Sequence, residues 1–336
     1  MRFRSLISLL CLCLASSLLA EQKPKEIASN PITFPKTVYL EEIPSGTVLN
    51  FEFCFKVNSP CKLFLITYKY LDKKNEPLLY RRLVAHHMAD IDRFITIFDE
   101  ANKVRTCSSD LKKGDFCCIT HPYSENAPSH DKLAFIECTA YFRSPTPPGI
   151  GTCTLKVPVK KFKCETKLVL PFSGLWWHLE GHDTFSHHRR IFYEQNTNYF
   201  ASDFMKVDDK LSICKNAGAK NEDYYSYGEP VFAVADGVVV KVIDGIADNP
   251  IGGRAKGFNP KDGKMAGGNT VIINHQDAFF SYYAHFKNGT IKVKEKQSVK
   301  AGEILGLCGN SGNSDAPHIH FHLISKLAFS PLNAHG

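Results

Sequence analysis

Hydrophobic and polar positions alternate along several short stretches of the first half of the chain. In residues 51–57, Phe or Val occupies every odd position, and Glu, Cys or Lys occupies every even one. A period of two is typical of β-strands. Similar short runs occur at residues 63–71, 94–98, 132–142 and 154–159, and the Pro- and Gly-rich residues 144–151 predict a loop between two of them. This pattern predicts a β-sandwich-like domain over residues 37–170.

The second half, from residue 172 to about 330, also has the pattern of β-strands. Its apolar runs are residues 231–235, 238–242, 269–274, 279–285, 304–307 and 317–324. We find no long amphipathic helical pattern, so the sequence predicts a second domain that is also all-β. Ala235-Asp-Gly237 predicts a hairpin turn between two of the runs. Residues 244–268, rich in Gly, Pro and Asn, predict a protruding loop.

The N-terminus has the pattern of a secretory signal peptide. Arg2 and Arg4 precede an apolar run over residues 6–19, which ends in small residues at Ala20. The run is shorter than the roughly 20 residues that cross a bilayer, which disfavours an uncleaved anchor. We therefore expect residues 1–20 to be removed, residues 21–36 to form a flexible lead-in, and the protein to be periplasmic or extracellular.

Composition and cysteine usage fit an exported globular protein. Hydrophobic residues make up 43% and charged residues 22% of the 336 residues. The net charge of +7 favours anionic partners such as cell-wall polymers, nucleic acid or membrane headgroups, without selecting one.

Two of the 12 cysteines, Cys11 and Cys13, lie in the expected signal peptide. The number of the others is even, which predicts disulfides, concentrated in the N-terminal domain. The sequence leaves the connectivity of these disulfides open. A bridge between Cys214 and Cys308 is one possibility. The absence of a CxxC pair disfavours a cysteine zinc cluster.

The strongest chemical signal is the run Pro317-His-Ile-His-Phe-His322 near the end of the chain. On a strand, His318, His320 and His322 would project from one face. Imidazole is the commonest metal ligand and an acid or base near neutral pH. A solvated polar strand face is the alternative for such a pattern. The preceding Gly309-Asn-Ser-Gly312 permits tight turns just before the strand.

Four motifs in order carry a resemblance to a known family. They are Val231-Phe-Ala-Val-Ala-Asp-Gly237, Tyr283-Ala-His285, Gly309-Asn-Ser-Gly312 and His318-Ile-His320. With them the chain resembles the lysostaphin-type, or LytM-type, zinc endopeptidases over roughly residues 180–325. The resemblance implies a LytM-type antiparallel β-sheet peptidase domain over residues 172–330.

The resemblance also implies a ligand set, because the family binds zinc through a His and an Asp of an early motif and the second His of HxH. His320 would be that last His, and His318 and His285 the catalytic histidines. The Asp would be Asp203, in Phe200-Ala-Ser-Asp-Phe204. The usual HxxxD spacing falls on Tyr199, so the first ligand is expected farther upstream.

The first ligand would come from the histidines before Asp203. We favour His187, followed by His188, with His182 as a distant third. Two His and one Asp suit Zn²⁺ and leave a position for water. Zinc would acidify that water and polarise the scissile carbonyl, and His318 or His285 would move the proton or stabilise the oxyanion. No HExxH motif is present, which excludes a thermolysin-like arrangement.

The implied function is that of a secreted zinc metalloendopeptidase cutting stem or cross-bridge peptides of bacterial peptidoglycan. Its partners would be peptidoglycan peptides, with no nucleic acid and no membrane span after signal cleavage. The main alternative is a catalytically inactive module that binds cell wall or activates another hydrolase. A third possibility is that the N-terminal domain keeps the enzyme latent. Trp176 and Trp177 could stack on a sugar, although core packing is the commoner role of such residues.

Overall fold

The structure is a computed structural model that divides into two compact units, residues 1–162 and 163–336. It describes residues 26–34, 36–43, 46–49, 51–84, 94–101, 104–105, 109–121, 127–129, 131–145, 149–161, 166–181, 188, 201–257, 259, 263–275 and 279–325. The expected signal peptide lies outside these residues. Within them, no helix has the length and apolar character needed to cross a membrane.

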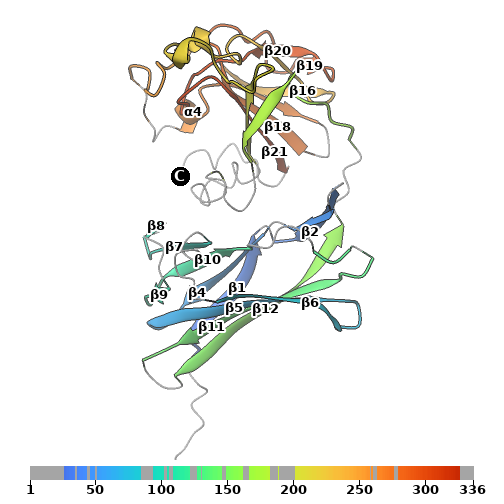
Figure 1. The fold of residues 1–336 in the computed structure, drawn as a ribbon, viewed down its shortest axis with the longest axis vertical. Helices are drawn as coiled ribbons and strands as arrows, with labels where there is room; N and C mark the ends of the chain where they lie inside the picture. The colour runs from blue at the N-terminus through green and yellow to red at the C-terminus, as the bar shows by residue number, and fades with distance from the viewer. Residues whose placement is uncertain are drawn as a thin grey trace, which may run out of the picture. The chain divides into compact units, whose positions relative to one another are not determined.

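Two β-sheets form the N-terminal unit (Figure 1). In order, the strands of the first sheet are β1 (Ala28–Phe34), β4 (Glu52–Val57), β10 (Phe116–Thr120), β7 (Ile95–Phe98) and β8 (Val104–Arg105). Those of the second are β3 (Gly46–Leu49), β2 (Val38–Ile43), β12 (Ile150–Lys161), β11 (Phe135–Arg143), β5 (Cys61–Leu71) and β6 (Pro77–Val84), with β9 (Asp110–Leu111) also paired to β5. β2 and β12 pair in parallel, whereas the other described pairs of this unit are antiparallel.

One hydrophobic core joins the two sheets. Phe53 and Phe55 of β4 belong to the same buried cluster as Tyr68 of β5 and Phe142 of β11. Burying each such ring contributes about 1.5–3 kcal/mol relative to exposure. Because residues from both sheets meet in this core, the predicted β-sandwich-like domain is confirmed.

The polar positions of β4 differ from a simple alternating strand. Glu52 and Cys54 are 2% and 0% exposed, so both faces of β4 are buried. Cys54 lies directly opposite Cys118 of β10, and the two form a disulfide. The Thr120 hydroxyl donates to Glu52 at 3.4 Å. A cross-strand bridge and a paired carboxylate thus occupy the face that periodicity alone would expose.

Two expectations for the N-terminal half differ from the structure. Residues 28–34 were expected in a flexible lead-in but form β1, because their backbone pairs with β4. Residues 166–170, expected in the first domain, belong to the second unit. The reason is that the Val169 N–H donates to the Val234 carbonyl and the Phe232 N–H to the Pro171 carbonyl.

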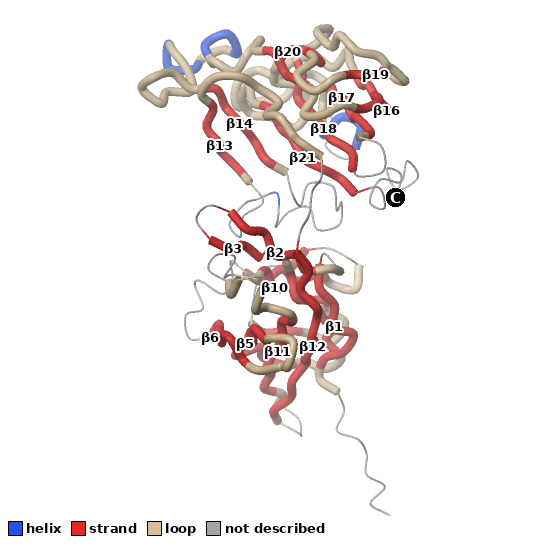
Figure 2. The backbone as a smooth tube through the Cα atoms, turned by 90° about the vertical axis from the view of Figure 1, so that its right-hand side faces the viewer, coloured by secondary structure: helices blue, strands red, loops and turns tan. Residues whose placement is uncertain are grey.

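A seven-stranded antiparallel sheet forms the C-terminal unit (Figure 2). In order, its strands are β13 (Trp176–Glu180), β14 (Ser202–Lys206), β21 (Ile319–Ser325), β18 (Phe279–Phe286), β17 (Asn269–Asn274), β16 (Gly237–Ile243) and β19 (Ser298–Val299). β15 (Pro230–Phe232) and β20 (Ile304–Leu307) form a separate pair. The helical elements with described bounds are α4 (Gly263–Ala266) and the 3-10 turns η3 (Asn216–Gly218) and η4 (Asn221–Asp223), and His188 is helical as well. The all-β fold is therefore confirmed.

The core of this unit lies on one face of the large sheet. Tyr283 of β18 and Ile319 of β21 pack in one cluster with Val231 of β15 and Leu305 of β20. Side chains alternate along a strand, so His320 and its cross-strand partner Asp203 occupy the opposite face. The candidate functional residues thus lie on the face turned away from this core.

One predicted connection is wrong, and one predicted loop is only partly as expected. Ala235-Asp-Gly237 does not join a hairpin, because β15 pairs with β20 while β16 pairs with β17 and β19. The Asp236 carboxylate instead accepts from the Ala301 N–H at 2.9 Å and fixes the crossing between sheets. Residues 244–268 do not simply protrude. Asn249 is 1% exposed and donates to the Gly312 and Ser314 carbonyls.

The cysteines give one bridge among the described residues, Cys54–Cys118. The possible bridge between Cys214 and Cys308 does not form, and both thiols are free. Cys107 and Cys164 lie outside the described residues.

Candidate metal centre

Strand pairing brings Asp203 and His320 together. β14 and β21 are antiparallel neighbours, and these two residues lie directly opposite each other. Directly paired residues point to the same face of a sheet, with their Cβ atoms about 5 Å apart. The His320 Nδ1 lies 2.9 Å from the Asp203 Oδ1. Both residues are 6% exposed, so a carboxylate and an imidazole meet in a buried setting.

His188 completes a cluster with this pair. Its Nε2 lies 3.3 Å from the Asp203 Oδ2, and the residue is 3% exposed. The ligand atoms of His188, Asp203 and His320 all lie within 4.8 Å of one another. His187, favoured on sequence, and His182 lie outside the described residues. Among the described histidines upstream of Asp203, the structure places His188, our second choice, beside the carboxylate.

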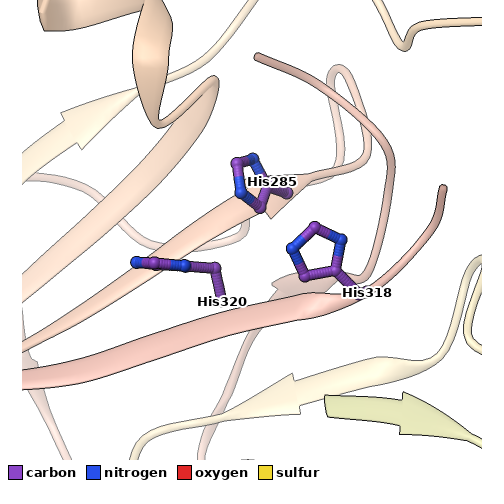
Figure 3. Close-up of side chains that lie close together, drawn as sticks. All are labelled: His285, His318 and His320. Atoms are coloured by element: carbon purple, nitrogen blue, oxygen red, sulfur yellow. The ribbon is translucent and has the colours of Figure 1, made fainter. Parts of the chain in front are cut away.

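His285 reaches the same place through a β-bulge. Tyr283 pairs with Val271 and Phe286 with Asn269, so two residues of β18 face one residue of β17. His285 adopts a positive φ of 64°, which few residues other than glycine adopt. Its ring centroid lies 5.6 Å from that of His320 and 4.7 Å from that of His318. Figure 3 shows the three imidazoles gathered between two neighbouring strands.

Backbone carbonyls of one turn orient two of these imidazoles. The His285 Nδ1 lies 2.7 Å from the Ser311 carbonyl, and the His318 Nδ1 lies 2.8 Å from the Ala316 carbonyl. A carbonyl can only accept, so each Nδ1 carries a proton. In the neutral ring each Nε2 then keeps its lone pair. The His318 Nε2 lies 3.5 Å from the Asp203 Oδ1, on the side of the cluster.

Buried side chains hold that turn in shape. The Asn310 amide donates to the Asn221 side chain at 3.0 Å, and the Ser314 hydroxyl donates to Asn310 at 2.7 Å. The same Ser314 hydroxyl lies 3.1 Å from the His318 Nδ1. Gly312 has a φ of 79°, and a Cβ at this position would collide with the backbone of Gly268. The predicted Gly309–Gly312 turn is thus a rigid support for the histidine strand.

The electrostatics of the cluster favour an anionic Asp203. Burial alone would raise the pKa of this carboxyl, but the nearby His318 and hydrogen bonds with three histidines outweigh it and hold the pKa well below its usual range. Burial, together with His318 and His320, holds the pKa of His285 well below its usual value. Burial lowers the pKa of His318, but Asp203 more than offsets this and raises it. A buried anion surrounded by imidazoles is a suitable setting for a cation.

The donor set fits zinc. Two imidazoles and one carboxylate are ordinary zinc ligands, and three protein ligands leave one tetrahedral position for water. Here the three donor atoms converge within 4.8 Å, and the carboxylate has no Lys or Arg in a described ion pair. His188, Asp203 and His320 are therefore able to hold the ion, with His285 and His318 beside it.

His322 is not part of the ligand set expected from the sequence, but it lies on the same strand face and is more deeply buried. Its Nδ1 is 3.1 Å from the His320 Nε2, and the residue is 1% exposed. The i, i+2 spacing of His320 and His322 predicts a shared strand face but not the contact between their rings. Trp176 and Trp177, which form one pair in the sequence, have different surroundings. Trp176 stacks on Phe172 with ring centroids 4.8 Å apart, whereas Trp177 is 54% exposed.

The sheet brings Asp203 and His320 onto one face, His188 approaches them from the segment before β14, and His285 and His318 lie beside them, so the cluster has the donor groups of a metal site. The chain belongs to peptidase family M23, whose model matches residues 223–331. This match contains His285, His318 and His320, whereas His188 and Asp203 precede it. The resemblance predicted from four motifs is confirmed.

Similar proteins include both a peptidase and an activator. The chain is 36% identical over 101 residues to lipoprotein NlpD of Yersinia enterocolitica, covering 30% of this chain and 82% of that protein. It is 33% identical over 107 residues to the peptidoglycan DD-endopeptidase ShyA of Vibrio cholerae, covering 32% and 20%. It is 35% identical over 101 residues to the murein hydrolase activator NlpD of Escherichia coli, covering 30% and 21%. The chain thus spans only about a fifth of the last two relatives.

Among solved structures, the catalytic domain of the antimicrobial peptidase lysostaphin from Staphylococcus simulans is 21% identical, covering 49% of this chain and 84% of that one. Its TM-score of 0.24 is too low to support a structural inference.

Proposed function

We propose that this protein is an exported zinc metalloendopeptidase that hydrolyses peptide bonds of bacterial peptidoglycan. One observation carries the proposal. Ligand atoms of His188, Asp203 and His320 lie within 4.8 Å of one another, and those of His285, His318 and His320 do so as well. Such a set supplies both the ligands for an ion and two imidazoles that can move protons beside it.

His188, Asp203 and His320 would hold the zinc. For the upstream ligand we propose His188, because its Nε2 lies 3.3 Å from the Asp203 Oδ2, whereas His187 lies outside the described residues. When bound, zinc would polarise the scissile carbonyl and lower the pKa of water toward neutrality. Asp203, anionic and buried, would offset the charge of the ion.

His285 and His318 would carry out the proton transfers. In each, the Nδ1–H donates a hydrogen bond to a main-chain carbonyl, so each presents its Nε2 to the cluster. A neutral Nε2 accepts a proton from the attacking water, and a protonated Nε2 donates a hydrogen bond to the developing oxyanion or a proton to the leaving amine. Two such imidazoles on one side of the ion supply both roles.

The substrate class rests on the relatives. ShyA is named a peptidoglycan DD-endopeptidase, and NlpD of Escherichia coli a murein hydrolase activator. A net charge of +7 suits an anionic polymer such as the cell wall. The signal-like N-terminus supports export to the periplasm or beyond, where that polymer is found.

A second candidate function is that of a non-cutting activator or cell-wall-binding module. The names of the NlpD relatives favour it. The gathered imidazoles and carboxylate favour the enzyme, because an activator has no need of a buried anion with three histidines on it.

One experiment distinguishes the enzyme from the activator. The purified protein is analysed for zinc by mass spectrometry, and defined muropeptides are digested and read by the same method. We expect one zinc per chain and cleaved peptides. His320→Ala and Asp203→Ala should lose both, whereas His318→Ala should keep zinc and lose cleavage.

His178→Ala, on exposed β13, serves as the matched histidine control and should keep both properties. A folded wild-type protein that binds no zinc and leaves every muropeptide intact would support the activator instead.

A further inference from the structure

We infer that His322 is a positioning residue for the metal centre, which accepts a hydrogen bond from the His320 Nε2–H and so directs the His320 Nδ1 lone pair toward the ion. The inference rests on the proposed function, because it concerns how His320 would be held as a ligand.

The contact geometry is that of an oriented imidazole pair. The His320 Nε2 and the His322 Nδ1 are 3.1 Å apart. The two ring planes meet at 87° with centroids 5.2 Å apart, so one ring points its nitrogen edge at the other. Both residues lie on the same face of β21, two positions apart.

The position of the proton on His320 sets the direction of this hydrogen bond in the metal-loaded state. The His320 Nδ1 faces the Asp203 Oδ1 at 2.9 Å, so Nδ1 is the nitrogen on the side of the ligand cluster. A neutral imidazole that ligates through Nδ1 must carry its proton on Nε2. The described acceptor for that proton is the His322 Nδ1. Histidine ligands generally donate their second N–H in this way, which fixes the tautomer and ring orientation.

Packing across the sheet holds the His322 ring in place. Tyr282 pairs with it across the sheet and stacks on its ring at 4.5 Å and 15°. Because its Nδ1 accepts the hydrogen bond from His320, the neutral His322 ring has one remaining N–H to place. Its remaining proton then lies on Nε2, which is buried and has no hydrogen-bond partner among the described residues. An unpaired polar atom is costly to bury, so this arrangement favours a role in orienting His320 over simple packing.

Three substitutions separate the acceptor from the ring. In His322→Asn the amide oxygen occupies the place of Nδ1 and can still accept. In His322→Gln the amide lies at the place of Nε2 and misses His320. In His322→Phe the ring that stacks on Tyr282 is kept and the acceptor is lost. The full chain of each variant is titrated with zinc against a chromophoric chelator, which gives the zinc Kd without any substrate.

We expect His322→Phe and His322→Gln to weaken zinc binding about 10- to 100-fold, and His322→Asn to retain most of it. Equal affinity for wild type and His322→Phe would overturn this inference while leaving the proposed function intact. A wild-type protein that binds no zinc would overturn both. If near-UV circular dichroism shows that His322→Phe is unfolded, the comparison of Asn with Gln decides, and equal Kd values for those two would contradict the inference.

Discussion

His285 illustrates how a single residue can depart from the pattern of its strand. Ala284 pairs with His320, so regular alternation would send the next side chain to the opposite face. The positive φ of 64° in the bulge returns it to the face of His320. A non-glycine residue in this conformation costs about 1–2 kcal/mol. Backbone strain at a candidate catalytic residue is a recurrent feature of functional sites.

This strain gives a stability test. His285→Gly should be more stable than His285→Ala by about 1 kcal/mol, because glycine adopts positive φ without a Cβ penalty. Urea unfolding of the two metal-free variants measures the difference. In an ordinary strand the order is reversed, with Gly the less stable by about 0.5–1 kcal/mol. That reversed order would show that His285 is not held at positive φ.

His275 predicts a dependence of stability on pH away from the metal cluster. It is 6% exposed, its Nδ1 donates to the Asp236 carbonyl, and its Nε2 accepts from the Ser281 hydroxyl. Burial lowers its pKa below 6.5, against a smaller opposite effect of Asp236. The unfolded chain therefore binds a proton first as pH falls below 6.5, and this contribution to the free energy of unfolding is lost on acidification.

The comparison is between wild type and His275→Gln, both metal-free, unfolded in urea from pH 7.5 to 5.5. Wild type should lose up to about 1.4 kcal/mol more per pH unit than the variant below the unfolded pKa. Above it the two curves should run parallel. Parallel curves over the whole range would remove His275 as the titrating group.

At the scale of elements, the turn over residues 309–312 supports the histidine strand, and its motif can be recognised in the sequence. Asn310, Ser311 and Gly312 are fully or nearly fully buried and hydrogen-bonded to three other segments. Gly312 combines positive φ with a backbone contact at Gly268, whereas Gly289 has a similar φ of 70° and open space around it. The two glycines therefore separate conformational strain from steric collision.

Gly289→Ala should cost about 1–2 kcal/mol, the strain of positive φ alone. Gly312→Ala should cost clearly more, because the added Cβ must also displace the Gly268 backbone, and overpacking adds about 1–3 kcal/mol. Thermal or urea unfolding of both variants gives the comparison. Equal losses would mean that the turn relaxes around the new methyl group.

Much of the fold and part of the candidate site follow from local sequence. Residues 269–274 were predicted as a strand and form β17, because their pattern depends only on neighbours. The pairing of Asp203 with His320 spans 117 positions, and it was reached through motif resemblance, not periodicity. Strand pairing, which long-range contacts decide, caused the errors at residues 235–237 and 28–34. The contact of His322 depended on which way the buried rings face, which spacing cannot give.

At the scale of the whole molecule, the two compact units have separate cores. One buried cluster lies wholly within residues 27–159 and another within residues 231–319. A ligand that binds only the native state stabilises it by RT ln(1 + [L]/Kd). Zinc at the proposed site should therefore stabilise the C-terminal unit and leave the N-terminal unit unaffected.

Differential scanning calorimetry with and without a chelator tests this expectation. Removal of zinc should shift one of two transitions to lower temperature and leave the other in place. At free zinc 100 times Kd, the stabilisation is about 2.7 kcal/mol. Asp203→Ala is the control, and its transitions should not respond to the chelator. A shift of both transitions would show that the units unfold together.

The hydrogen bonds from the His285 and His318 imidazoles to main-chain carbonyls have an evolutionary consequence. Ser311 and Ala316 fix the protons of His285 and His318 through main-chain oxygens, which every amino acid possesses. Which ring nitrogen of each histidine carries the proton therefore depends on the number of residues in the loop. It does not depend on which side chain occupies position 316. A lineage can drift at that codon without altering proton placement, whereas a single in-frame deletion between the two positions would misalign both imidazoles at once.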